Sequence, residues 1–457
     1  MVDRDRLFGV WRRTVALSWP ISVQQALTTL MRTVDLVVAG LFAPAYVTAV
    51  GLADLYAQIP LRIGLALGTG AIALSSQDTG RAAATTRNRA ITQAVLIGFL
   101  AGVPLVAVGL LFADPLIAVL GAEPGVVDLA AAYLALVFAA APMRVVGLVG
   151  ARSLQGTGDT VTPMFVNGGA NLCNATLTVL LALGVGPFPQ LGIVGIGLAT
   201  LLARTVEAAA ITVAILSART DLAFARPRSL TITRQVLGVS LPNFAEGMST
   251  SLANFPFNSL LLLFGTEVNA AYHIGRRAYQ QLTGPLYRAV STAASIVVGQ
   301  LLGEGDPGGA RYAGFAIAAL SVLTMGVAGA VLFVGAGPVA AVFTDDPETL
   351  SYAATFTRVF GVSMLFFGVF FPFAGSLRGA GDTRTPFYAR AVGTFVFMLG
   401  ASYLLAVPLD WGLLGVYVGT AASYLCWAVI AVAGFVWGDW AGRAAGMMSE
   451  RDELPTD

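Results

Sequence analysis

Long apolar segments follow one another along almost the whole chain, and they restrict its fold more than any other feature. Twelve can be counted between residues 15 and 437, each near the roughly 20 residues that a helix needs to cross a bilayer. Hydrophobic residues make up 56% of the 457 residues and charged residues 11%, against about 25% charged in soluble domains. Segments of this length satisfy their backbone groups in lipid as helices. We therefore predict an all-α polytopic membrane protein with twelve transmembrane helices.

The residue types of catalytic and metal sites are scarce. Cys173 and Cys426 both lie in apolar segments, and His273 is the only histidine. A disulfide framework, a CxxC site or a histidine-based zinc site is therefore not expected, and neither is a cofactor. An intramembrane enzyme would need a nucleophile with a base, or a metal motif, and the scattered acids do not supply one. The net charge of +1 gives no indication of nucleic acid binding.

Arginines are concentrated in alternate loops, which predicts the orientation. The loops on the opposite side carry acids such as Asp114, Glu123 and Asp410, and no arginine. By the positive-inside rule, both termini are predicted to be cytoplasmic, in a multi-pass protein of the cell membrane. Residues 1–13 show no cleavable signal pattern.

The chain contains an internal repeat. The segment 153–163 returns as 376–386 with eight of eleven positions identical, at an offset of 223. Similar offsets relate Leu17–Pro20 to Val239–Pro242 and Gly192–Gly195 to Gly412–Gly415. With six helices in each half, both halves enter the membrane from the same side. We predict two six-helix bundles related by a pseudo-twofold axis along the membrane normal, with binding between them.

The repeat also predicts the domain organisation. The expected parts are an N-terminal segment 1–13, an N-lobe 14–218, a connector 219–234, a C-lobe 235–440 and a polar tail 441–457.

The first helix of each half carries a polar stripe. From Pro20, steps of four reach Gln24, Thr28 and Arg32, with Asp35 following on the same face; from Pro242, the same steps reach Glu246, Thr250 and Asn254. A charge at that depth costs about 3 kcal/mol on insertion scales, so these faces should line a polar interior. A carboxylate in such a cavity can carry a proton. A local salt bridge to Arg32 is the competing interpretation for Asp35, and for Glu246 the functional and structural readings are evenly balanced.

Other predicted helices carry polar side chains at helical spacing. The cavity candidates among them are Gln58, Arg62, Asn167, Arg277 and Gln281. Interhelical hydrogen bonding is common in membrane bundles, and it is the favoured interpretation for Gln58, Asn174, Thr178 and the pair Arg204 and Glu207. Pro20 is a hinge candidate because a proline interrupts the helical hydrogen bonds.

The chain resembles the MATE (multidrug and toxic compound extrusion) transporters over nearly its whole length. The resemblance is carried by Pro20 to Leu52 with Val34–Gly40, by Leu241–Glu246, by Gly265–Ala271, by Gly299–Pro307 and by Leu377–Thr383. It implies a V-shaped cavity between two bundles and antiport by alternating access, driven by protons or sodium.

The resemblance also implies roles for individual residues. In the DinF-like branch, of archaeal or bacterial origin, a carboxylate of the first helix couples transport to the ion, and Asp35 occupies its position. Asn171 and Thr200 match further polar members of that ion site. Ala175 stands where related proteins often carry an aspartate, which favours a proton over sodium.

The substrate is expected to be a small molecule that a monomer exports through the lipid bilayer. An amphipathic organic cation is typical of the resemblance. The arginines within predicted spans, Arg32, Arg62, Arg276, Arg277, Arg288 and Arg358, leave open an anionic substrate instead. A flippase or exporter of an anionic or lipid-linked metabolite is the alternative function.

Overall fold

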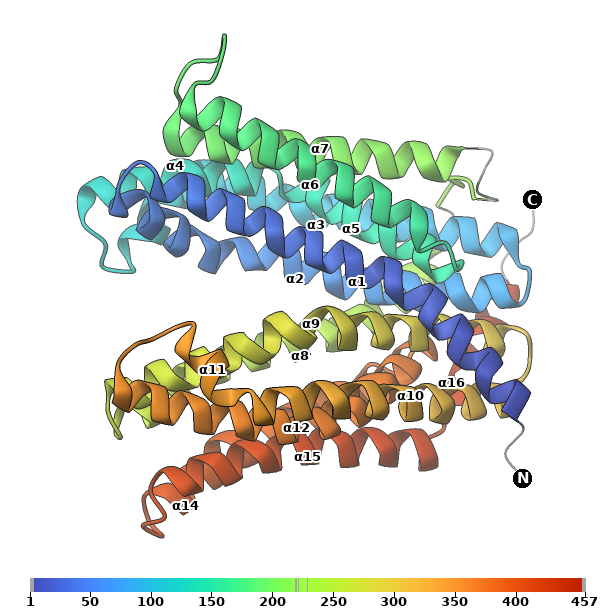
Figure 1. Ribbon diagram of the computed structural model, residues 1–457. Helices are drawn as coiled ribbons and strands as arrows, with labels where there is room; N and C mark the ends of the chain where they lie inside the picture. Colours follow the sequence, from blue (N-terminus) through green and yellow to red (C-terminus); the bar gives the residue numbers. More distant parts are fainter. Residues whose placement is uncertain (1–3, 218–219, 221, 228, 454–457) are drawn as a thin grey trace. The chain divides into compact units, whose positions relative to one another are not determined.

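The computed structural model of this protein describes residues 4–217, 220, 222–227 and 229–453, and the regular structure in these ranges is entirely helical (Figure 1). The chain forms two compact units. We call the unit Pro20–Ser240 with Glu450–Asp457 the N-unit, and the unit Met1–Trp19 with Leu241–Ser449 the C-unit.

The N-unit contains the larger part of the first helix and the six helices that follow it. Their bounds are α1 (Arg4–Gly40), α2 (Pro44–Gly80), α3 (Ala84–Ala118), α4 (Pro124–Ala139), α5 (Ala141–Gly156), α6 (Val161–Leu183) and α7 (Gly192–Leu216). The helices α4 and α5 meet at an angle of 46°. Pro142 lies at the start of α5, where it has no N–H for the preceding turn, so the bent pair reads as one broken span.

The C-unit contains most of α8 and the helices up to α16. Their bounds are α8 (Leu230–Leu262), α9 (Thr266–Gly303), α10 (Pro307–Val334), α11 (Ala336–Ala341), α12 (Pro347–Gly379), α13 (Arg384–Val392), the π-helix η1 (Gly393–Ala401), α14 (Ser402–Ala406), α15 (Leu413–Trp437) and α16 (Trp440–Asp452). The segments α13, η1 and α14 continue directly into one another and form one helical segment.

The predicted fold class is confirmed. Within the described residues, eight helices are long and apolar enough to cross a membrane, or nine if the bent pair is one span. The helices α1, α8 and α9 carry more polar residues, yet they have 37, 33 and 38 residues, which exceeds the roughly 20 needed to span a bilayer. Joining α4 to α5 and α13 to α14 gives twelve long helical segments, which is consistent with twelve spans.

The repeated loop has the same local structure in both halves. It follows α5 in the first half and α12 in the second. Gly158 and Gly381 have φ angles of +100° and +82°, in the left-handed region that glycine adopts without strain. The next residues, Asp159 and Asp382, each accept a hydrogen bond from the backbone N–H three residues later, at 2.9 and 3.2 Å. These contacts stabilise the start of the following helix.

The N-terminal part of α1 belongs to the C-unit, which differs from the predicted lobe boundary at residue 14. Trp11 donates from its indole nitrogen to the carbonyl oxygen of Ala316, at 2.8 Å. The guanidinium of Arg6 lies 4.5 Å from the ring centre of Tyr312. Both contacts join α1 to α10, so the unit boundary falls between Trp19 and Pro20.

The end of α16 is held in the N-unit by a fully buried guanidinium. Arg451 has no exposed surface, and its Nη2 lies 3.0 Å from Asp78 Oδ1. It also donates to the side-chain oxygens of Gln235 and Gln77, at 2.7 and 2.9 Å. Asp78 accepts a second guanidinium from Arg81, at 2.9 Å. A buried ion pair of this kind fixes the geometry of its surroundings because an unpaired charge there is strongly unfavourable.

We expect Arg451→Ala to lower the free energy of unfolding by on the order of 3 kcal/mol, because Asp78 and two amides lose a buried partner. Thermal unfolding of the purified protein in detergent measures this loss. Arg443→Ala is the matched control on the same helix: Arg443 pairs with Asp382 at 2.6 Å but its side chain is 45% exposed. Asp382 also keeps hydrogen bonds from Arg384 and Thr385, so a change within about 1 kcal/mol is expected. Equal melting temperatures for the two variants would contradict the prediction.

Candidate functional site

Three helices of the N-unit place neutral polar side chains around Asp35. The Asp35 side chain on α1 is 6% exposed, and its Oδ1 accepts a hydrogen bond from the Thr178 hydroxyl of α6 at 2.9 Å. When the Asn174 amide is turned so that its nitrogen faces Asp35, that nitrogen donates to Oδ1 at 3.2 Å, and the amide oxygen accepts from the backbone N–H of Thr200 on α7 at 3.2 Å. The carboxylate is therefore held by uncharged groups.

A second cluster in the same unit is built around Glu207 of α7. Its carboxylate accepts from Arg204 Nη1 at 2.5 Å and from Asn167 Nδ2 at 2.7 Å. Asn171 extends the cluster by donating to Asn167 Oδ1 at 2.9 Å and to the Thr28 hydroxyl at 3.3 Å. Arg204 also approaches Asn171 Oδ1 at 3.4 Å. The helices α1, α6 and α7 thus carry two neighbouring hydrogen-bonded clusters, one around Asp35 and one around Glu207.

The two clusters include several of the predicted residues, but the partners of Asp35 differ from those that were predicted. Asn171 was expected beside Asp35, yet it contacts the Glu207 cluster, while Thr200 reaches Asp35 through Asn174. Thr178 and Asn174 were expected to form interhelical hydrogen bonds, and the partner that both of them contact is Asp35. Their spacing on one face of α6 is the signal that could have identified them. Arg32 is exposed, and among the described residues it forms no ion pair with Asp35.

Most of the remaining predicted residues of the N-unit are only partly buried, and Gln24 is the exception. Gln24 is 8% exposed and accepts from Gln155 Nε2 at 3.2 Å. Gln58 and Arg62 on α2 are half-buried. Pro20 lies within helix α1, at the residue where the N-unit begins.

In the C-unit, Glu246 is buried between two arginines. Both of its carboxylate oxygens accept from Arg378 Nη2 at 2.8 Å, and Oε1 also accepts from Arg390 Nη1 at 3.2 Å. The equivalent position in the first half, Gln24, is neutral. Arg390 was not identified from the sequence, although the repeat offset of 223 from Asn167 leads directly to it.

Other predicted residues of the C-unit are more exposed. The Thr250 hydroxyl donates to the backbone oxygen of Glu246 at 3.0 Å, and Asn254 Oδ1 accepts from Arg276 at 3.1 Å. Arg277 and Gln281 are exposed on α9.

One difference separates Asp35 from every other buried carboxylate in the described ranges. The buried acids are Asp35, Asp78, Glu207, Glu246 and Asp382. Ion pairs with arginine hold Asp78, Glu207, Glu246 and Asp382. No arginine nitrogen lies within 4 Å of Asp35 among the described residues. Asp35 can therefore gain or lose a proton without breaking an ion pair.

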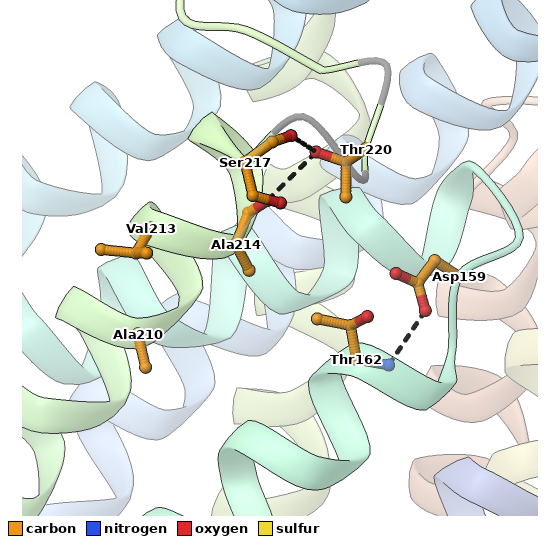
Figure 2. Close-up of a pocket in the computed structure, with 7 residues that line it drawn as sticks. All are labelled: Asp159, Thr162, Ala210, Val213, Ala214, Ser217 and Thr220. Carbon is orange, nitrogen blue, oxygen red and sulfur yellow. Dashed lines mark hydrogen bonds between the residues drawn. The ribbon is translucent and has the colours of Figure 1, made fainter.

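A separate small pocket of about 310 Å³ lies at the ends of α6 and α7 (Figure 2). Asp159 and Thr162 line one side, and Ala214, Ser217 and Thr220 line the other. The Thr220 hydroxyl bonds back to the carbonyl oxygen of Ala214 at 3.0 Å. None of its lining residues belongs to the clusters around Asp35 and Glu207.

Comparisons with known proteins agree on one family. The family model described as MatE matches residues 20–180 and 242–404. A probable multidrug resistance protein NorM of Thermotoga maritima is 24% identical over 97% of this chain and 96% of that protein. A protein named FAD transporter from Shewanella oneidensis is 27% identical over 76% of this chain and 75% of its own length. The crystal structure of a MATE P26A mutant has a TM-score of 0.86 at 22% identity, covering 98% of this chain and 99% of the other.

The Glu207 cluster predicts a characteristic pattern of stability changes. Glu207→Gln keeps an acceptor for Asn167 but leaves the Arg204 guanidinium without its counter-charge, so we expect a loss on the order of 3 kcal/mol. The double variant Arg204→Met with Glu207→Gln removes both charges and should recover most of that loss. Thermal unfolding in detergent measures both. A double variant that is no more stable than the single variant would contradict the ion pair as the cause.

Proposed function

This chain belongs to the MatE family, whose members are transporters, and from that premise we propose that it exports small organic compounds in exchange for protons. The similarity to proteins named for multidrug resistance supports an exporter. The near-complete coverage of those relatives supports extending their activity to the whole chain rather than to one half.

The single observation that carries proton coupling is that Asp35, among the described residues, is buried without an arginine ion-pair partner. A buried carboxylate with a guanidinium partner stays charged, because protonation would leave the cation unpaired. Asp35 instead contacts the hydroxyl of Thr178 and the amide of Asn174. A hydroxyl can donate or accept, and an amide offers both kinds of group. The site therefore has partners for the ionised and for the protonated acid.

Asn174 can serve the two states through the two orientations of its amide. With its nitrogen toward Asp35, it donates to the ionised carboxylate. With its nitrogen toward Thr200, it donates to that hydroxyl at 3.3 Å and presents its oxygen to Asp35, where a protonated acid can donate to it. Rotation of one amide thus provides a hydrogen-bond partner for each charge state of Asp35. We propose Asp35 as the coupling carboxylate, with Asn174, Thr178 and Thr200 as its positioning residues.

The coupling carboxylate lies on the same helix as the hinge candidate. On α1, Pro20 precedes Gln24, Thr28 and Asp35, and the proline interrupts the helical hydrogen bonds at its own turn. We propose that protonation of Asp35 changes the packing of α1 on α6 and α7 and that this change drives alternating access. Sodium is the second choice of ion. The sites for hard cations are built from several oxygen ligands, and Ala175 supplies none.

An anionic cargo is the second candidate substrate class. One relative is named FAD transporter, and FAD carries phosphate groups. The observation in this chain that favours an anion is the pair of arginines around Glu246, and its consequences are developed in the next subsection.

We expect Asp35→Asn to abolish proton-driven efflux, because an amide does not change its protonation state near neutral pH as a carboxyl group can. Purified protein is placed in liposomes with an imposed pH gradient, and efflux of ethidium and of an anionic dye is followed. The variant should transport at the rate of protein-free liposomes, while a sodium gradient without a pH gradient should drive no efflux by the wild type.

Asp54→Asn is the matched control, because Asp54 is a carboxylate of the neighbouring helix α2 that is exposed in the structure. It should retain proton-driven efflux. Wild-type rates in Asp35→Asn would overturn the coupling assignment, and strong sodium dependence with no response to pH would overturn the choice of ion.

A further inference from the structure

The C-unit contains a cluster in which positive charge exceeds negative charge. It consists of Glu246 on α8, Arg378 at the end of α12, Arg390 on α13 and Trp427 on α15, and we call it the arginine cluster. Arg378 and Arg390 share the one carboxylate of Glu246. The guanidinium of Arg390 also lies 4.5 Å from the ring centre of Trp427, a distance at which the ring attracts the cation. The cluster holds two cations and one anion.

Donor groups of the cluster are left without acceptors. The Nε atoms of Arg378 and Arg390 and the indole Nε1 of Trp427 are buried and unpaired in the described part of the chain. Arg378 Nη1 reaches only the Ser291 hydroxyl, at 3.5 Å. Buried donors normally find partners. The side chains of Arg378 and Arg390 are 15% and 23% exposed, against 3% for Glu246, so the two cations are partly accessible whereas the acid is buried.

Comparison of the two halves shows that this excess charge is a departure from the repeat. Glu246 and Arg378 stand at the repeat positions of Gln24 and Gln155, and each pair forms a hydrogen bond between its members.

The second pair of the cluster follows the same rule. Arg390 and Trp427 stand at the positions of Asn167 and Glu207, and these pairs are also in contact. The repeat thus conserves the contacts in space but changes their chemistry. Glu207 is balanced by Arg204 in the first half, whereas the second half has one cation in excess.

The proposed proton site also differs between the halves, but here the first half carries the charged residue. The repeat position of Asp35 in the second half is Phe257, which is fully buried in an apolar cluster. At the repeat positions, the C-unit therefore has an apolar ring in place of the carboxylate with uncharged partners, and the N-unit has Asn167 in place of Arg390. The two halves have specialised in different charges.

The backbone beside Arg390 is also irregular. Helix α13 ends at Val392 and continues as a π-helix over Gly393–Ala401; such segments are rare and are frequently found at functional sites. A Cβ at Gly393 would lie 2.2 Å from Trp427 Cδ1. Glycine at this position therefore allows the indole to pack against the backbone next to Arg390, which positions the guanidinium.

We propose that the arginine cluster binds an organic anion through a carboxylate or phosphate group. The anion would lie against the exposed sides of Arg378 and Arg390 and accept from the guanidinium N–H groups on those sides. Charge-assisted bonds between guanidinium and carboxylate or phosphate are strong and directional. Glu246 is the internal counter-ion that holds the two arginines in place when no substrate is bound. This inference rests on the proposed export function and assigns its substrate class.

The test is equilibrium binding of 1-naphthyl phosphate and 1-naphthoate to the purified full chain, with 1-naphthylmethylammonium as the cation of matched ring. Both anions should bind and the ammonium should not. Arg390→Gln should weaken anion binding about tenfold or more, because one charge-assisted bond is lost. Arg390→Lys should retain an intermediate affinity, since it keeps the charge without the planar fork.

Glu246→Gln separates a binding site from a purely structural ion pair. Removing the competing carboxylate should tighten anion binding about tenfold, whereas a structural pair would lose stability with no gain in affinity. If this variant does not fold, Arg390→Gln decides alone, because Glu246 keeps Arg378 as its partner there. Arg311→Gln is the matched control: Arg311 also lies over a tryptophan, Trp440, at 5.9 Å, outside the cluster.

The source of the anion is identified by competition in nanodiscs. Displacement of 1-naphthyl phosphate by dioleoyl phosphatidate, but not by phosphatidylcholine, indicates a lipid headgroup, and no displacement indicates a soluble anion. Equal binding of the ammonium compound, or wild-type affinity in Arg390→Gln, would overturn the proposal. Binding is measured without a pH gradient, so a failure of proton coupling leaves this result unaffected.

Discussion

The energetic penalty for an unpaired charge in a low-dielectric interior governs the polar architecture of this protein. Four of the five buried carboxylates in the described ranges are neutralised by arginine, as expected when desolvation must be offset by a partner. Asp35 is held by neutral groups instead, so taking up a proton would remove its charge without leaving a cation unpaired. The same energetic penalty explains why the other four acids serve as ion-pair partners and why Asp35 is suited to carry a proton.

Duplication supplied two copies of one contact pattern, and divergence gave each copy a different charge. Gln24 and Glu246 each lie four residues after a repeated proline, and Gln155 and Arg378 occupy the same position in the repeated segment. The pair Gln24 with Gln155 and the pair Glu246 with Arg378 are therefore the same contact in the two halves. Keeping the backbone packing while changing the side chains gives one half the proposed proton site and the other half the arginine cluster. A transporter that exchanges a proton for an organic anion would use such a division.

Much of the fold could be predicted from the sequence because its signals are local or repeated. Long apolar segments predict spans, and the loop 153–163 and its copy predict two related halves. Both loops adopt the same backbone, with Gly158 and Gly381 in the left-handed region. The boundaries of the compact units could not be predicted from the sequence. Their position at Pro20 depends on contacts of Trp11 with a helix about 300 residues later, which no local pattern encodes.

The sequence by itself determined the membrane class, the internal repeat, the resemblance to one transporter family and the choice of Asp35 as the coupling candidate. The tertiary structure decided which groups each charge contacts. Arg32 is three residues from Asp35 but exposed, whereas Thr178 is 143 residues away and bonded to it. Glu246 finds Arg378 and Arg390 at separations of 132 and 144 residues. Helical periodicity fixes the face on which a side chain lies, but the partner across that face depends on how neighbouring helices are rotated and aligned, and only their packing sets this.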